Sequence, residues 1–237
     1  MKIAIILILI ILILHFIKTD QIYVFNNELI KKNINEIQYK TGDVIFFRHD
    51  SPLYFYGDNG INMDIHVVKN IGKTLFHFTQ PFFSHCGIVI IRDNIPFVLQ
   101  LTFDDNYDNY NKKSIIGCPV LTSMSELYKY KGVLYHNEYI GPPITNIESI
   151  LKDIYSKDIY FEGSIFNQFM VNIMNISLHN KNNMVCCDFV LYVMEKFGIV
   201  REFKYCDLNY VHNICKTSKN YATRQTIIKT QLFKCLR

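Results

Sequence analysis

The segment FFSHCGIVIIRDNIPFVLQLTF, residues 82–103, holds two runs of β-branched and aromatic residues on either side of a short polar turn. Two such runs are typical of a β-hairpin, and Asp93 and Asn94 are residues that favour its turn. A two-residue turn at this place pairs Arg92 with Ile95. The segment therefore predicts a hairpin whose register is fixed by local sequence.

His85 begins the first strand of this hairpin. Because side chains alternate along a strand, His85 and Gly87 share one face, and a glycine there leaves room for another backbone or a substrate. In the expected register His85 faces Thr102, and Gln100 lies diagonally across on the same face, within reach of a long side chain. Gln100 is therefore the first candidate to orient the imidazole, and Thr102 is the competing one.

A second decisive stretch is NNMVCCDFVLYVMEKFG, residues 182–198. Its apolar positions follow the period of a helix that ends at Gly198, a natural residue after a helix C-terminus. One face of this helix carries Cys186, Val190, Val193 and Phe197. Cys186 is therefore both at the helix N-terminus and directed inward, where free N–H groups and the helix dipole stabilise a thiolate. Cys187, about 100° further round, is expected to point elsewhere.

A cysteine nucleophile needs a base, and this base is normally a histidine. Of the eight histidines, His85 is the one that starts an apolar strand beside a glycine. We therefore predict a site with Cys186 as nucleophile, His85 as base and Gln100 as orienting group. Each residue alone is more often structural, so the prediction depends on their combination.

Cysteine spacing and net charge exclude other classes of function. The seven cysteines contain no CxxC pair, and adjacent His85 and Cys86 point to opposite faces of a strand, so neither a metal nor a cofactor is expected. An odd number of cysteines leaves at least one thiol free or paired between chains. The net charge of +4, without a basic stripe interleaved with aromatic residues, argues against nucleic acid as a partner.

The rest of the chain mixes strands and helices without a regular βαβ alternation, which predicts an α+β fold. A strand is expected after the turn at Gly42 and Asp43, a strand–helix–strand unit over residues 117–140, and a helix over residues 146–157. Residues 19–39 are expected to form a linker or helix.

Residues 3–14 at the N-terminus are unbroken aliphatic and show no polar face. Their length is typical of the apolar core of a signal peptide, yet no small-residue cleavage site follows. A cleaved signal peptide and an uncleaved signal anchor both remain open for residues 1–18. Either one predicts a protein of the secretory pathway or of a membrane.

Three short motifs occur in a recognisable order: TGDVIFF at residues 41–47, SHCGIVI at 84–90 with FVLQLT at 97–102, and CCDFV at 186–190. In this order the chain resembles the circularly permuted papain-like cysteine hydrolases of the NlpC-like superfamily. The branch most similar to it contains the YiiX-type and poxvirus proteins, and lecithin–retinol acyltransferase is a more distant relative. The resemblance extends over residues 40–200.

The resemblance implies a permuted papain-like domain over residues 40–237, in which a small antiparallel sheet or half-barrel with the histidine packs on the helix with the cysteine. It implies acyl transfer through a thioester, with Cys186 as nucleophile and His85 as base, on a peptide, lipid or acylated substrate. Cys187 and Asp188 then occupy the Ser and Glu places of the family's helix motif.

Gln100 occupies a place where this branch often has Glu, which implies reduced or altered activity. The alternative function is therefore a catalytically inactive, membrane-tethered interaction protein that retains the fold. The poxvirus kinship, together with heavy use of Ile, Asn and Lys, suggests a viral protein in the virion or a host-cell membrane.

Overall fold

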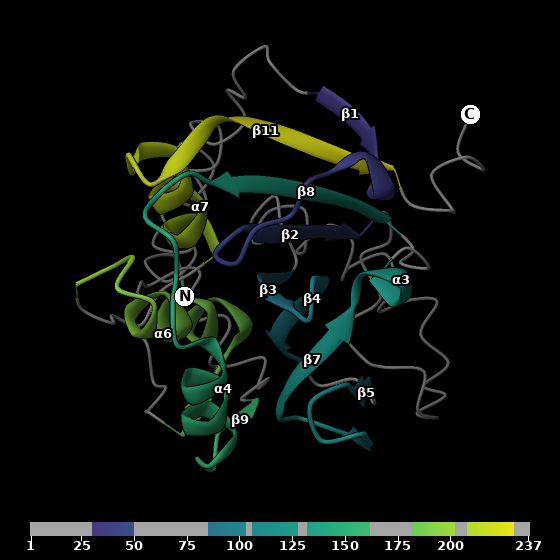
Figure 1. Cartoon of the computed structure of the whole chain (residues 1–237), viewed down its shortest axis with the longest axis vertical. Coiled ribbons are helices and arrows are strands. Elements are labelled where there is room, and N and C mark those ends of the chain that lie inside the picture. The colour runs from purple at the N-terminus through teal and green to yellow at the C-terminus, as the bar shows by residue number, and fades with distance from the viewer. Residues whose placement is uncertain are drawn as a thin grey trace, which may run out of the picture.

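The computed structural model describes residues 30–49, 85–102, 106–127, 132–161, 182–201 and 208–229. In these residues a seven-stranded sheet curls into half of a barrel, as the changing strand direction from β11 to β7 shows (Figure 1). In spatial order its strands are β1 (Ile30–Asn33), β11 (Tyr221–Lys229), β8 (Gly132–Tyr139), β2 (Val44–His49), β3 (His85–Arg92), β4 (Ile95–Leu101) and β7 (Pro119–Ser123). Neighbours are antiparallel, except that β1 runs parallel to β11.

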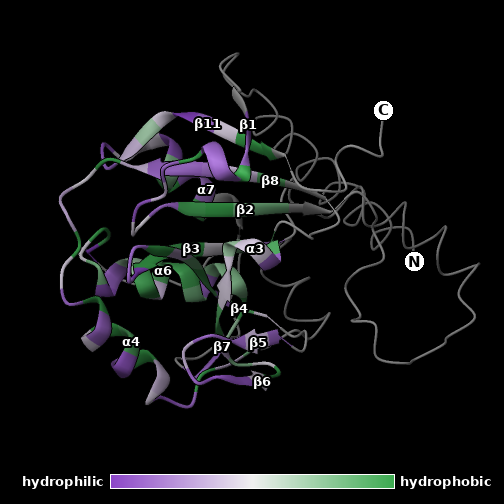
Figure 2. Ribbon diagram, turned by 45° about the vertical axis from the view of Figure 1, so that its right-hand side comes forward, coloured by the Kyte–Doolittle hydropathy of each residue, from purple (hydrophilic) through white to green (hydrophobic). Residues whose placement is uncertain are grey.

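The two longest of the described helices pack on the sheet and on each other. Helix α6 packs against β3 and β4, and α7 packs against β11 and α6 (Figures 1 and 2). The helices are η1 (Ile34–Glu36), α3 (Met124–Leu127), α4 (Ile147–Tyr155), α6 (Cys186–Lys196) and α7 (Leu208–Thr217). Two further strand pairs join β5 (Asn106–Asp108) to β6 (Lys113–Ile115) and β9 (Tyr160–Phe161) to β10 (Asn183–Met184). The predicted α+β architecture with a half-barrel is confirmed.

The central hairpin β3–β4 has the predicted register. Arg92 pairs with Ile95, and the ladder continues in step to Ile88. Asp93 and Asn94 have φ angles of 50° and 61°. Positive φ at both central residues is what a type I′ hairpin turn requires. Local turn chemistry therefore sets which residues of the two strands lie opposite each other.

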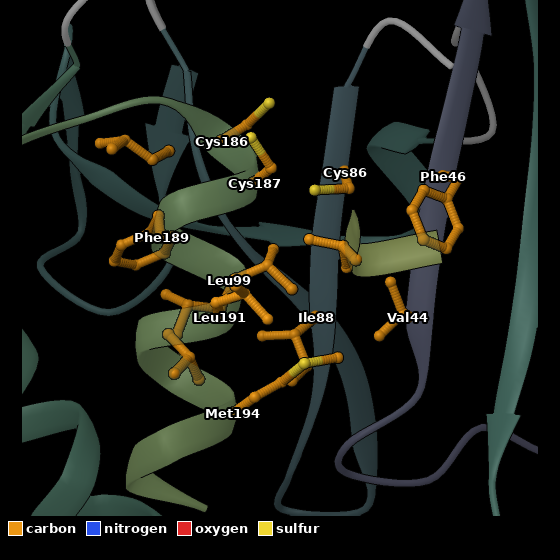
Figure 3. Packing of buried hydrophobic residues seen from close by; sticks show 14 of the residues in the cluster. Val44, Phe46, Cys86, Ile88, Leu99, Cys186, Cys187, Phe189, Leu191 and Met194 are labelled. Atoms are coloured by element: carbon orange, nitrogen blue, oxygen red, sulfur yellow. The ribbon is translucent and has the colours of Figure 1, made fainter. Parts of the chain in front are cut away.

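Both faces of the sheet are covered, so each strand contributes to two cores. The face toward α6 carries Val44, Phe46, Cys86, Ile88, Ile90, Leu99 and Leu101, several of which Figure 3 shows against the helix. The opposite face carries Ile45, Phe47, Val89, Val98 and Leu134, which pack with Ile34, Met124 and Leu127. Burial on both faces explains why β2 and β3 are almost continuously apolar in sequence.

Helix α6 begins at Cys186, as predicted, and ends before Gly198, whose φ of 70° allows the chain to turn away from the helix. The predicted inward face lies in the core. The helix is nevertheless buried beyond that face, because Cys187 and Leu191 are also enclosed. Because side chains on more than one side of α6 are buried, this helix is a central element of the domain.

Three segments differ from the expectation or lie beyond it. Of residues 19–39, expected to form a linker or helix, the described part from residue 30 holds the short 3-10 helix η1 and the edge strand β1. The β1 sequence Ile-Lys-Lys-Asn has no apolar alternation, and β1 pairs with the distant β11. The polar C-terminal region forms α7 and β11, to which the sequence analysis assigned no element. The apolar leader, residues 1–18, lies outside the described residues. No helix among the described residues is long and apolar enough to cross a membrane.

Candidate active site

The three predicted site residues come from three elements that meet at one end of the sheet. Cys186 is the first residue of α6, His85 is the first residue of β3, and Gln100 lies near the end of β4. His85 Nε2 and Gln100 Oε1 are 2.9 Å apart. The predicted hydrogen bond between these two side chains is therefore present.

The Gln100 amide determines which imidazole nitrogen carries the proton. A carbonyl oxygen only accepts hydrogen bonds, so His85 Nε2 must be the donor to Oε1. In the neutral ring the other nitrogen, Nδ1, is then the one that accepts a proton. The ring of Phe47 packs edge-on against the imidazole at a centroid distance of 4.9 Å and restricts its rotation.

The surroundings of Cys186 favour its thiolate. The pKa of this thiol lies well below its ordinary value because Cys187 and Cys86 hydrogen-bond to the sulfur, and because the charge and hydrogen bond of His85 add to them. These effects outweigh burial, which opposes ionisation. Cys186 and His85 are therefore in direct interaction, as a nucleophile and a base must be.

Two neighbouring thiols belong to the site although the sequence analysis did not place them there. Cys86 points from β3 toward the start of α6, where Cys186 and Cys187 lie (Figure 3). Cys187, which was expected to point away from what Cys186 addresses, also helps to lower the pKa of Cys186 through a hydrogen bond to its sulfur. Strand alternation does place Cys86 on the face opposite His85, but only the packing of α6 against β3 brings it to Cys186.

The cysteines that the structure describes form no disulfide bond: Cys86, Cys118, Cys186, Cys187 and Cys215. In the part of the chain that the structure describes, no group of three or more His, Cys, Asp or Glu side chains has the arrangement of a metal site.

The start of α6 offers backbone hydrogen-bond donors beside the Cys186 sulfur. Val185 occupies the N-cap position in extended conformation, and its apolar side chain supplies no capping hydrogen bond to the first turn. The first N–H groups of a helix have no partner within the helix, and they bind negative charge well. The backbone N–H of Cys186 is therefore placed to donate to an oxygen that becomes negative near its sulfur.

The Gly-Asp motif serves the fold instead of the chemistry. Asp43 is fully buried, and its Oδ2 accepts hydrogen bonds from His136 Nε2 at 2.7 Å and from the backbone N–H of Lys40 at 2.9 Å. Its Oδ1 accepts from the backbone N–H of Tyr139 at 2.7 Å. Gly42 has a φ of 100°, which a side chain would make costly. This motif thus ties the start of β2 to the end of β8.

Comparisons with known proteins give distant similarity to solved structures. No protein-family model matches the chain, and no curated protein matches it in sequence. Among solved structures, the chain is similar to the crystal structure of metalloprotein yiiX from Escherichia coli O157:H7. The two share 12% identity with a TM-score of 0.37, over 83% of this chain and 93% of that one. The chemistry of the site must therefore be argued from its own residues.

Proposed function

We propose that this protein is a cysteine hydrolase or acyltransferase of the permuted papain-like kind, which cleaves an amide, ester or thioester bond. The observation that carries this proposal is the hydrogen bond of 2.9 Å between His85 Nε2 and Gln100 Oε1. It gives the imidazole the tautomer that a base for Cys186 needs, at the N-terminus of a helix that favours the thiolate.

In the proposed reaction, His85 Nδ1 holds the proton that leaves Cys186, and the thiolate attacks the carbonyl carbon of the substrate. The carbonyl oxygen becomes negative, and the Cys186 backbone N–H donates a hydrogen bond to it. The imidazolium then gives its proton to the departing amine, alcohol or thiol, which leaves an acyl group on Cys186 as a thioester. Water or an acceptor, deprotonated by His85, releases the acyl group and restores the thiol.

The neutral amide of Gln100 should make this reaction slower than a carboxylate at the same position would. Its amide oxygen orients the imidazole but carries no full charge, so it stabilises the imidazolium less than a carboxylate would. The hydrogen bonds from Cys86 and Cys187 act at the other end of the ion pair, on the thiolate. We infer that these thiols compensate for part of what a neutral orienting group lacks.

The substrate class is proposed from the apolar leader. Residues 3–14 are aliphatic and are followed by no obvious cleavage site, so they favour a protein held at a membrane. A lipid or a lipid-modified protein is the acyl donor that a membrane brings to the site. For the same reason we propose that the protein is located in the secretory pathway or at a membrane, including that of a virion or host cell.

Intact-mass spectrometry after incubation with activated acyl esters of short and long chain tests the reaction. Wild type should gain one acyl group, which hydroxylamine removes and which peptide mapping places on Cys186. Cys186→Ala should gain none, and His85→Ala should acylate about 10² to 10⁴ times more slowly. Cys215→Ala, which removes a buried thiol of α7, should behave like wild type. A folded wild type without any adduct would favour the catalytically inactive interaction protein instead.

A further inference from the structure

A continuous line of hydrogen bonds extends from the site across three adjacent strands. His85 on β3 bonds to Gln100 on β4, and Gln100 Nε2 donates to Thr122 Oγ1 on β7 at 2.9 Å. Thr122 lies diagonally across from Gln100, because Val98 pairs with Thr122 and Gln100 pairs with Val120. Thr122 is 3% exposed and Gln100 is 5% exposed, so neither side chain exchanges these partners for bulk water.

A neutral amide needs an additional constraint that a carboxylate does not need. Both oxygens of a carboxylate accept hydrogen bonds, so either one can face an imidazole N–H. The amide of Gln100 presents either Oε1 or its NH₂ group to His85, depending on a rotation of its terminal torsion. With the NH₂ group toward His85, Nε2 would have to be the acceptor, and the proton would move to Nδ1. Nδ1 could then no longer accept the proton of Cys186.

Thr122 fixes the orientation that the site requires. Its Oγ1 accepts from Gln100 Nε2, and this directs Oε1 to His85. The Thr122 hydroxyl could also donate a hydrogen bond to the amide. The protonated imidazole in the working site decides which end of the amide faces Thr122. Imidazolium Nε2–H tolerates only an acceptor, so Oε1 faces His85 and the NH₂ group faces Thr122. Without Oγ1, a buried N–H of the amide would lose its partner, which costs free energy.

We propose that Thr122 is a positioning residue of this site, which holds the Gln100 amide so that His85 keeps its proton on Nε2 and Nδ1 stays available to Cys186. This inference rests on the proposed thiol chemistry, in which His85 acts as the base. It adds a residue that touches neither the nucleophile nor a substrate and that acts through Gln100 alone.

The test compares Thr122→Val, which keeps the shape of the side chain and removes Oγ1, with Thr122→Ser, which keeps the hydroxyl. The imidazole ¹⁵N shifts of His85 in the NMR spectrum report its tautomer without any turnover. At a pH at which the imidazole is neutral, wild type and Thr122→Ser should show the Nε2–H form, and Thr122→Val should show a mixture with the Nδ1–H form. Alkylation of Cys186 at neutral pH should be roughly five to ten times slower in Thr122→Val, as expected for one lost hydrogen bond.

The matched control is Thr223→Val on β11, an exposed strand threonine outside the site, which should leave both measurements unchanged. Thr122→Val should also lose its effect on the tautomer in a Gln100→Glu background, because both oxygens of Glu accept. If Thr122→Val does not fold, Thr122→Ala carries the same test, since it also removes Oγ1 and adds no atom.

The outcomes separate this proposal from the proposed function. A Thr122→Val protein with the wild-type tautomer and alkylation rate would overturn the role of Thr122, even if wild type forms the acyl adduct. A changed tautomer in Thr122→Val would support that role even if no acyl donor reacts with wild type.

Discussion

Gly87 and Val98 lie so close across the β3–β4 pair that a Cβ atom on Gly87 would come within 2.4 Å of Val98 Cγ1. The same Cβ would lie 3.3 Å from Gln100 Cβ and 3.2 Å from the Leu99 carbonyl oxygen. The room that a glycine beside His85 was expected to leave is therefore taken by β4. This close approach is what allows Gln100 to reach His85 from the neighbouring strand.

We predict that Gly87→Ala both destabilises the domain and weakens the site. The methyl group must push β4 away, at a cost of about 1–3 kcal/mol in the free energy of unfolding, which urea denaturation measures. The displacement lengthens the His85–Gln100 hydrogen bond, so Cys186 should alkylate more slowly.

The control for this prediction is Gly117→Ala. Its φ of 66° makes a side chain costly, but no atom lies within 4 Å of the added Cβ. It should lose about 1 kcal/mol of stability and keep the wild-type alkylation rate. Equal alkylation rates in wild type and Gly87→Ala would contradict the role of this close approach.

Cys86 should act on the reactivity of Cys186 although it takes no part in bond formation. Cys86 helps to lower the pKa of Cys186 through a hydrogen bond to its sulfur. Cys86→Ala should therefore raise the pKa of Cys186, so that the rate of its alkylation rises with pH at a higher midpoint than in wild type.

Iodoacetamide labelling followed by peptide mapping over a range of pH measures the Cys86→Ala effect. Cys215→Ala is the matched control, because Cys215 is equally buried and lies on α7. The same map reports Cys187, which should react more slowly than Cys186. A midpoint that stays at the wild-type value in Cys86→Ala would remove this thiol from the site.

The parts of the site that could be predicted from the sequence are those fixed by contacts between residues close together in the chain. The Asp93-Asn94 turn is local, and it fixes the register that brings Gln100 to His85. The helical period from Cys186 onward is local too, and it places that thiol at a helix start. Both features were predictable for this reason.

Contacts made by pairing of distant segments were not predictable. The link between Gln100 and Thr122 requires β7 to lie beside β4, and the Cys86 contact requires α6 to dock on β3. Neither arrangement leaves a pattern in the residues themselves. The same holds for β11, which pairs with β8 and β1 although the sequence around Tyr221 to Lys229 was assigned no strand.

Substitutions at Gln100 should distinguish orientation from charge. Gln100→Ala removes the partner of His85 Nε2, so acyl transfer should slow while substrate binding changes little. Gln100→Glu keeps the acceptor and adds a negative charge that stabilises the imidazolium, so activity should be preserved or raised.

Steady-state kinetics with an activated ester separates the two effects at Gln100, since loss of orientation lowers kcat and leaves KM unchanged. Gln225→Ala is the control, because this buried glutamine of β11 donates a hydrogen bond to Asn137 on β8, away from β3 and β4. Wild-type kcat in Gln100→Ala would exclude Gln100 from the site and return Thr102 as the orienting residue.

His212 on α7 should make the stability of the fold sensitive to acid. It is buried, with the ring of Phe46 edge-on at 5.5 Å, and burial together with the charge of Lys216 lowers its pKa from 6.5 to about 4. The unfolded chain therefore binds a proton between pH 6.5 and 4 that the folded chain does not. Stability present above pH 6.5 is lost as the pH falls toward 4, by about 3 kcal/mol in all.

Urea denaturation at a series of pH values between 4 and 7.5 measures this dependence. His212→Gln cannot be protonated, so its free energy of unfolding should fall less steeply with acid than that of wild type. Lys216→Gln removes the repulsion and should raise the pKa of His212, which also flattens the curve. Lys219→Gln, an exposed lysine on the turn that follows α7, is the control and should keep the wild-type slope. A His212→Gln curve as steep as that of wild type would show that another group causes the loss of stability in acid.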